Sequence, residues 1–105
     1  MSAADPASIF AALGDETRLR LVARLGSAGP LSIARLTTGT HVTRQGVTRH
    51  LDVLAQVGLA HSTRRGRERL WQLDRVPLDE ARSYLDDLSR QWDEALARLK
   101  TSVEE

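Results

Sequence analysis

The polar row formed by Gln45, Thr48 and Arg49 is the part of this sequence best suited to contact another molecule. In an α-helix over residues 43–57, these side chains lie on one side of the helix. Glutamine can pair with adenine and arginine with guanine through two hydrogen bonds each, while threonine can contact a thymine methyl or a phosphate. The pattern predicts a helix that contacts DNA bases, although an ordinary amphipathic surface helix has the same pattern. The opposite side of the helix is apolar: Val47, Leu51 and Leu54.

The segment before this helix favours the DNA-binding alternative. A short helix over 31–38, ended by Gly39, precedes the polar helix, which begins at the candidate N-cap Thr43 and stops at Gly58. Two short helices joined by a turn that contains glycine are typical of a helix-turn-helix, here residues 31–57. The second helix of that motif enters the DNA major groove.

After Gly58 the pattern predicts a β-hairpin over 59–73. Residues 59–64 and 67–73 are expected to be strands, and Arg65-Gly66 is expected to form the tight turn between them. A run of charge is usually a solvated loop. Its place directly after the polar helix favours contact with DNA phosphates instead. The hairpin contains four arginines: Arg64, Arg65, Arg67 and Arg69.

The distribution of charge is uneven, and the composition is that of one globular domain over residues 1–105. Residues 41–75 contain 7 Lys/Arg and 3 Asp/Glu, a net charge of +4, whereas residues 76–105 contain 4 and 8, a net of −4. The middle of the chain is therefore suited to a polyanion. Cysteine is absent, and the sequence shows neither a secretory signal nor a membrane span, so a cytoplasmic protein without a membrane partner is expected.

Two further helices are predicted before residue 30. Asp5 and Pro6 suit the N-cap and first position of the first helix, which Gly14 ends. Asp15 is the candidate N-cap of the second helix, over 16–29. Apolar positions recur at helical spacing in both. In the first helix they are Ile9, Phe10 and Leu13, and in the second they are Leu19, Val22 and Leu25 with Leu21 beside them.

A long helix over 77–100 carries a heptad pattern. One apolar residue recurs every seven positions, and small or apolar residues fill the alternating spacing of three and four. Such a pattern is typical of a helix that packs lengthwise on another helix. Its length favours a partner subunit over packing within its own domain. The repeating residues are Leu78, Leu85, Trp92 and Leu99, with Ala81, Leu88 and Ala95 between them.

The runs ALGDETRLRLVARL, VTRQGVTRHLDVLAQVGLA and RRGRERLWQLD resemble the ArsR/SmtB family of bacterial transcriptional repressors. The resemblance implies a mainly α fold with a small β-hairpin wing, a dimeric winged helix-turn-helix of order α-α-α-α-β-β-α. It also implies a homodimer formed by segments 1–14 and 77–100, which represses an operator beside its own or a neighbouring operon. The residues expected at the dimer interface are Ile9, Phe10, Leu13, Leu85, Leu88, Trp92 and Leu99.

The DNA-contacting positions of that family carry over residue by residue. His50 lies at the border of the apolar face, so a structural histidine and a phosphate contact are both open. Arg69, nearer the base of the hairpin, could equally pair with an acidic neighbour. The positions that correspond to family contacts on the helix are Thr43, Arg44, Gln45, Thr48, Arg49 and His50, and those on the wing are Arg64, Arg65 and Arg67.

The sequence departs from the resemblance in two respects. Gly46 stands where relatives more often have alanine, and it should cost about 0.5–1 kcal/mol within a helix unless a preceding helix approaches closely. Metal-sensing relatives use cysteines, or ligands that include histidine on the last helix. This chain has no Cys, and no His in 77–105. Because His41, His50 and His61 lack ligand spacing, neither a metal nor a cofactor is expected, and any small-molecule effector remains open.

Two other classes of function compete with a DNA-binding repressor. A winged helix can serve only as a protein–protein interaction module, but such a module has no need for the basic hairpin. An enzyme is not supported, because the sequence shows no catalytic triad, no glycine-rich phosphate loop and no paired carboxylates. Sequence-specific regulation of transcription is therefore the prediction.

Overall fold

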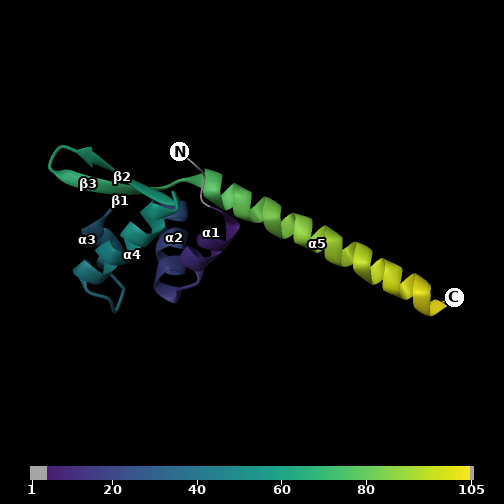
Figure 1. The fold of residues 1–105 in the computed structure, drawn as a ribbon. Helices are drawn as coiled ribbons and strands as arrows, with labels where there is room; N and C mark the ends of the chain where they lie inside the picture. The colour runs from purple at the N-terminus through teal and green to yellow at the C-terminus, as the bar shows by residue number, and fades with distance from the viewer. Residues whose placement is uncertain (1–4, 105) are drawn as a thin grey trace.

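The computed structural model describes residues 5–104 and confirms a mainly helical winged helix-turn-helix (Figure 1). Residues 1–4 of the predicted first dimerisation segment, and residue 105 of the predicted domain, lie outside the described part. The elements in chain order are α1 (Pro6–Leu13), α2 (Glu16–Ala28), β1 (Leu31–Ser32), α3 (Ile33–Thr37), α4 (Arg44–Gln56), β2 (Ala60–Arg65), β3 (Glu68–Leu73) and α5 (Arg75–Glu104).

The core is built around α4, which packs against α1, α2, α3 and β2. Its residues Val47, Leu51 and Leu54 are fully buried, so the predicted division of this helix into an apolar and a polar side is confirmed. The predicted stripe of α2 was partly wrong. Leu21 and Leu25 are buried, whereas Leu19 is 51% exposed. The side of α2 that packs on the core is therefore the side of Leu21 and Leu25, and Leu19 lies outside it.

Side chains and backbone groups cap the helices as the sequence predicted. Asp5 and Asp15 accept hydrogen bonds from the N–H groups of the first turns of α1 and α2. Thr43 Oγ1 accepts from the Gly46 N–H at 3.0 Å and so caps α4. At the other end of α4, Gly58 has φ of +78°, and the Gly58 and Leu59 N–H groups donate to the carbonyls of 55 and 54. This is a Schellman motif, and it turns the chain directly into β2.

The sheet has three antiparallel strands in the order β1-β3-β2, one more than predicted. The prediction that residues 31–38 form only a helix was wrong at its start. Leu31 and Ser32 pair with Trp71 and Leu70 of β3, and Ser32 then caps α3. This pairing fixes the hairpin to the helical core, because Leu31 and Trp71 are both buried.

The hairpin turn lies one residue later than predicted. Arg65 pairs with Glu68, so the two-residue loop is Gly66-Arg67 and not Arg65-Gly66. Gly66 has φ of +63°, and Arg67 has no positive φ. Glycine at the first loop position alone is typical of a type II′ turn, which suits the right-handed twist of the strands. Hereafter "the wing" means β2, β3 and this turn, residues 60–73.

Helix α5 begins before the predicted residue 77 and runs past the predicted residue 100. Asp74 accepts a hydrogen bond from the Val76 N–H at 3.0 Å, which starts the helix ahead of Pro77. Proline is tolerated there because the first-turn N–H groups have no partner within the helix. The helix projects away from the core (Figure 1), and the radius of gyration is 18.2 Å. A compact domain of this length would have about 13 Å.

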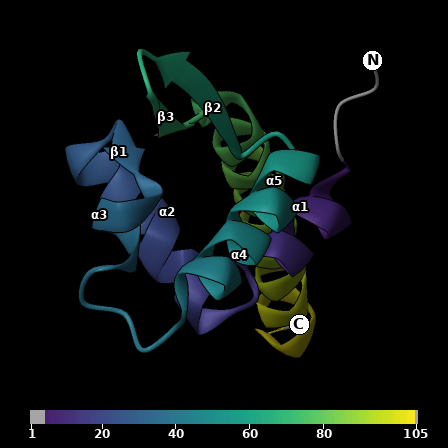
Figure 2. The same cartoon turned by 90° about the vertical axis from the view of Figure 1, so that its left-hand side faces the viewer.

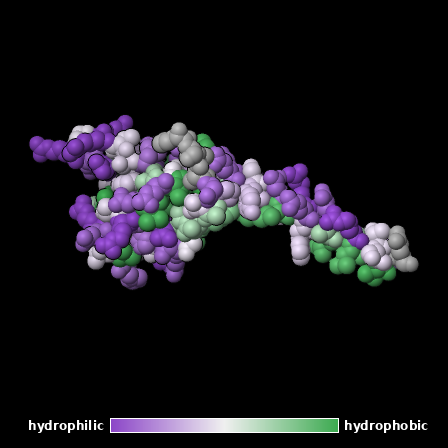
Figure 3. Space-filling view, viewed as in Figure 1, coloured by the Kyte–Doolittle hydropathy of each residue, from purple (hydrophilic) through white to green (hydrophobic). Residues whose placement is uncertain are grey.

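The heptad pattern of α5 divides into two parts. Near its start, Pro77 and Ala81 are buried and Leu78 packs on the core, and the helix lies against α1. Beyond residue 84 the large apolar side chains are exposed. Within the described residues they have no other element to cover them (Figure 3). We call these the α5 stripe: Leu85, Leu88, Trp92, Leu96, Leu99 and Val103.

The placement of α1 corrects one predicted interface residue. Ile9 is fully buried within the core of its own chain, so its side chain is not available to a second subunit. The spacing of apolar residues alone did not distinguish this buried position from one on an outward-facing stripe. Phe10 and Leu13 are partly buried at the edge of the core, and the Phe10 ring lies 6.0 Å from that of Tyr84 on α5.

Candidate nucleic-acid interface

The outer side of α4 presents arginine and glutamine side chains to solvent. Arg44, Gln45 and Arg49 are exposed, as predicted for residues that contact DNA. Thr48 is half-buried, and its hydroxyl donates to the Arg44 carbonyl at 3.0 Å. The oxygen and methyl group of Thr48 remain available to a partner, whereas the Thr43 hydroxyl oxygen already serves as the helix cap.

Gly46 allows the turn before α4 to approach the helix closely. A Cβ atom at this position would lie 2.4 Å from Cγ1 of Val42, which is partly buried against the core. The predicted close approach therefore exists, but it comes from the turn and not from the preceding helix. Gly46 thus sets how tightly residues 40–42 fold against the first turn of α4.

The register of the wing divides its arginines between two faces. Arg64 pairs with Arg69, and this pair shares a face with Ala60 and Trp71, the residues that pack on the core. Arg65 lies on the opposite face, across from Glu68. Like charges directly opposite each other on adjacent strands are destabilising. A polyanion against the face of Arg64 and Arg69 would relieve that repulsion.

In the part of the chain that the structure describes, the arginines of α4 and the wing have no acidic partners. Within residues 5–104, none of Arg44, Arg49 and the four wing arginines forms an ion pair, whereas Arg20, Arg75 and Arg90 each pair with a carboxylate. Hydrophilic surface covers the wing and the α3–α4 region, at the end of the molecule opposite the tip of α5 (Figure 3). These guanidinium groups are therefore available to phosphates and base edges.

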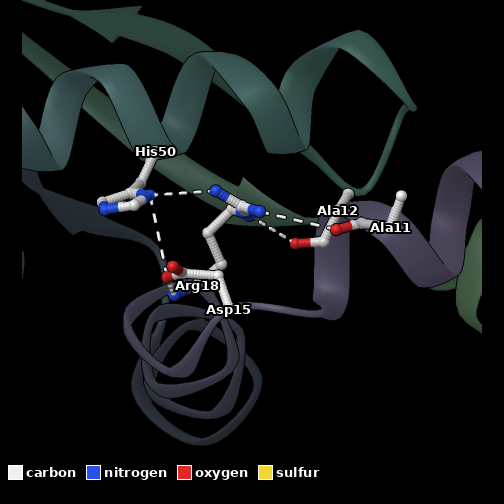
Figure 4. A network of polar contacts seen from close by, with 5 residues as sticks. All are labelled: Ala11, Ala12, Asp15, Arg18 and His50. Atoms are coloured by element: carbon white, nitrogen blue, oxygen red, sulfur yellow. Dashed lines mark hydrogen bonds and ion pairs between the residues drawn. The ribbon is translucent and has the colours of Figure 1, made fainter.

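His50 faces inward, which favours the structural alternative over a phosphate contact. Its Nδ1 lies 3.2 Å from Nη1 of Arg18 on α2 and 3.9 Å from Oδ2 of Asp15, and its side chain is only 23% exposed (Figure 4). We therefore remove His50 from the set of direct DNA contacts and treat it as part of the support of α4.

Arg18 closes the junction between α1 and α2. Its Nε donates to the Ala12 carbonyl at 2.5 Å and its Nη2 donates to the Ala11 carbonyl at 3.4 Å, at the open end of α1 (Figure 4). The Arg18 backbone N–H also donates to Asp15. That hydrogen bond, with smaller contributions from His50 and the Arg18 charge, lowers the pKa of Asp15 below its usual value.

Arg24 is a second supporting residue that sequence reasoning missed. Its guanidinium donates to the carbonyls of Leu36, Thr38 and Arg35 at 2.8–3.0 Å, at the C-terminal end of α3. It thereby fixes the start of the turn that leads into α4. The sequence offered a weak signal for Arg18 alone: α1 has no basic residue in its last turn, so its last carbonyls needed donors from another element.

Known proteins share this arrangement. The helix-turn-helix domain family matches residues 13–65. The HTH-type transcriptional regulator Rv2034 of Mycobacterium tuberculosis is 37% identical over 91 residues, which cover 87% of this chain and 81% of the relative. The uncharacterized HTH-type transcriptional regulator YuzN of Bacillus subtilis is 35% identical over 68% of this chain and 84% of its own length. An ArsR-like transcriptional regulator from Rhodococcus sp. RHA1 superposes with a TM-score of 0.80 at 34% identity, over 91% of this chain and 90% of that one.

The chain belongs to the ArsR family of helix-turn-helix transcriptional regulators. The family is not enzymatic, and its helix-turn-helix is a DNA-binding element. In this ArsR-family regulator, the matched residues 13–65 run from the end of α1 to the end of β2 and include all of α4. The exposed side of α4 is therefore its candidate DNA interface, supported by the wing.

Two further observations concern partners of this regulator. Across the described chain, no three His, Cys, Asp or Glu side chains come together in an arrangement that could hold a metal ion. Over residues 5–104, none of the helices combines the length and apolar character that crossing a bilayer requires.

Proposed function

We propose that this protein is a homodimeric repressor that binds a palindromic operator beside its own or a neighbouring operon. The observation that carries the proposal is that a basic surface and an exposed apolar surface lie at opposite ends of the molecule. Arginines without acidic partners lie on α4 and the wing at one end, and the bare α5 stripe lies at the other (Figures 1 and 3). The first surface suits DNA, and the second suits another copy of the same helix.

The α5 stripe supports dimerisation through its composition and spacing. Its residues recur at intervals of three and four along one side of the helix, and Trp92 is 65% exposed. Exposed apolar surface of this extent is typical of a protein–protein contact. Pairing of two α5 helices about a two-fold axis would bury the stripe on both subunits and present two copies of α4 together. Phe10 and Leu13 of α1 lie at the edge of the same region and would extend the contact.

Two groups of residues take different roles on DNA. Arg44, Gln45 and Arg49, with the methyl group of Thr48, are placed to contact base edges when α4 lies in the major groove. The N-terminus of α4 at Thr43 would lie near the phosphate backbone. The wing arginines Arg64, Arg65 and Arg67 would contact phosphates, which add affinity without sequence preference.

Selection of bound sequences from random DNA tests this function. The expected product is an inverted repeat whose half-sites are centred about 10 base pairs, or one helical turn, apart or at a multiple of that spacing. A pool that shows no enrichment after repeated rounds would contradict DNA recognition. That result would favour the alternative function, a winged helix used only for protein–protein contact.

We also propose that DNA release does not depend on a metal. The absence of cysteine from the sequence leaves no thiolate ligand, and the described histidines are not grouped with carboxylates in threes. Titration of zinc or cadmium into the protein–operator complex should leave the dissociation constant unchanged. Release of DNA at stoichiometric metal, reversed by a chelator, would contradict this proposal.

A further inference from the structure

We propose that His50 is a positioning residue of α4 that works only as the neutral imidazole, and that operator affinity falls when it is protonated. The inference rests on the proposed DNA-binding function. It concerns a residue that does not contact DNA but connects the DNA-binding helix to the helices behind it (Figure 4).

The partner of His50 determines which ring nitrogen carries the proton. Nδ1 lies 3.2 Å from Nη1 of Arg18. An arginine guanidinium has only donors and remains charged at every pH at which proteins fold, so Nδ1 must accept this hydrogen bond. The structure therefore assigns His50 the neutral tautomer with its proton on Nε2.

The same guanidinium binds the end of α1. Arg18 donates to Nδ1 of His50 on one side and to the carbonyls of Ala11 and Ala12 on the other. One side chain of α2 thus joins the last turn of α1 to the middle of α4. Because α1 also packs against the start of α5, this joint links α4 to the base of the helix that carries the α5 stripe.

Protonation of His50 would replace its attraction to Arg18 by repulsion. A protonated Nδ1 can no longer accept from Arg18, and the two cations would lie 3.2 Å apart. The charged groups that face the ring are Arg18 and Asp15 of the α2 end, while α1 contributes only carbonyls through Arg18. On α4 itself, the residues one turn away are uncharged: Gly46, Val47, Val53 and Leu54. The imidazolium would therefore turn toward Asp15, 3.9 Å away, and α4 would lose its polar link through Arg18 to the end of α1.

The two roles open to His50 predict opposite effects of pH. A histidine that contacts phosphate binds DNA more tightly when it is protonated, and it steepens the dependence of affinity on salt. A histidine that holds α4 in its neutral form weakens DNA binding when it is protonated. The sign of the pH effect therefore distinguishes them.

The test compares the full-length wild-type chain with His50→Asn, whose carbonyl oxygen can take the place of Nδ1 but does not titrate. Operator affinity is measured between about pH 8 and pH 5.5, the range in which histidines change charge. His41→Asn, at an exposed position, controls for general effects of histidine charge. From the loss of one hydrogen bond, the wild type and His41→Asn should lose about three- to tenfold in affinity on acidification relative to His50→Asn.

A second measurement tests the hydrogen bond between Arg18 and His50 in the absence of DNA. Imidazole ¹⁵N shifts of the labelled free protein near neutral pH should show His50 with the proton on Nε2, and Arg18→Gln should abolish that preference. If His50→Asn does not fold by circular dichroism, His50→Gln takes its place in the affinity measurement.

Three results would overturn the proposal. They are a proton on Nδ1 in the free protein, tighter binding by the wild type on acidification relative to His50→Asn, and equal pH profiles for the two. If the wild type binds no DNA at any pH, the proposed function itself fails. The ¹⁵N spectrum distinguishes that failure from failure of the joint.

Discussion

Arg49 and Arg67 are both exposed arginines that pair with no acidic residue among residues 5–104, yet their surroundings predict different roles. Arg49 projects from the middle of α4, where a helix in the major groove meets base edges. Arg67 occupies the second position of the wing turn, a site suited to the phosphate backbone. The difference lies in geometry and not in residue type.

Replacement of these two arginines should separate the roles. Arg49→Ala should weaken operator binding by about 1–3 kcal/mol and relax preference at one base position, with little effect on random DNA. Arg67→Ala should weaken binding to both DNAs equally and reduce the slope of log affinity against log salt by about 1. Fluorescence anisotropy at several salt concentrations measures both effects. Equal losses of Arg49→Ala on operator and random DNA would show that Arg49 contacts phosphate.

Asp15 should make folding stability depend on pH in acid. The pKa of Asp15 is lowered in the folded chain, chiefly by the Arg18 N–H, so the unfolded chain binds a proton more readily. Stability from this group is therefore complete above the unfolded pKa of about 3.9, and it is lost as the pH falls through the lower folded value. Asp15→Asn keeps a good N-cap but does not titrate. Its deficit in free energy of unfolding relative to wild type should shrink on acidification, as measured by urea denaturation. A constant deficit would contradict this role.

The sequence predicted least well which side chains contact residues of another helix. The amphipathic pattern gave the exposure of Gln45 and Arg49, because helical periodicity fixes which side faces solvent. It could not settle His50, which lies at the border of two faces and whose environment depends on Arg18 of another helix. The burial of Ile9 likewise depends on how α4 and α5 pack against α1.

The secondary structure was largely predictable, because caps and glycines mark its boundaries locally. Asp5, Asp15 and Thr43 cap the helices as expected. The missed strand β1 has only two residues, too few for any periodicity, and its partner Trp71 is distant in sequence. The turn of the wing shifted by one residue because the choice between type I′ and type II′ loops depends on strand register.

At Gly46, the turn before α4 lies so close to the helix that a larger residue would contact Val42. Gly46→Ala gains about 0.5–1 kcal/mol of helix stability from the smaller backbone entropy of alanine. The added Cβ, however, would lie 2.4 Å from Cγ1 of Val42, so the turn must move. We expect Gly46→Ala alone to lower the melting temperature, and to raise it when introduced into Val42→Ala. A stabilising effect in both backgrounds, by thermal denaturation, would show that Val42 moves aside freely.

The elongated shape of the molecule comes from α5, whose apolar side is only partly covered by its own chain. The start of α5 packs on its own core, whereas the α5 stripe extends into solvent, so the molecule measures 69 × 33 × 20 Å. The heptads predicted the length and apolar side of this helix. They could not show which part packs on its own chain, because the same residue types serve both purposes.

A charge within the α5 stripe should prevent self-association. Leu88 is 44% exposed, and an aspartate there would be buried without a partner between two helices. Leu88→Asp should therefore sediment as a monomer at concentrations at which the wild type is a dimer. Ala97→Asp places the same side chain on the opposite side of α5 and should remain dimeric. Retention of the dimer by Leu88→Asp would show that the stripe is not the subunit interface.

The stoichiometry on DNA tests most directly whether two copies of α4 act together. Analytical ultracentrifugation of labelled operator, either intact or with one half-site scrambled, counts the chains bound to each DNA. We predict two chains on the intact operator, a large loss of affinity when one half-site is scrambled, and a similar loss for Leu88→Asp on the intact operator. One chain bound to the intact operator, with the same affinity for the scrambled site, would contradict dimeric recognition.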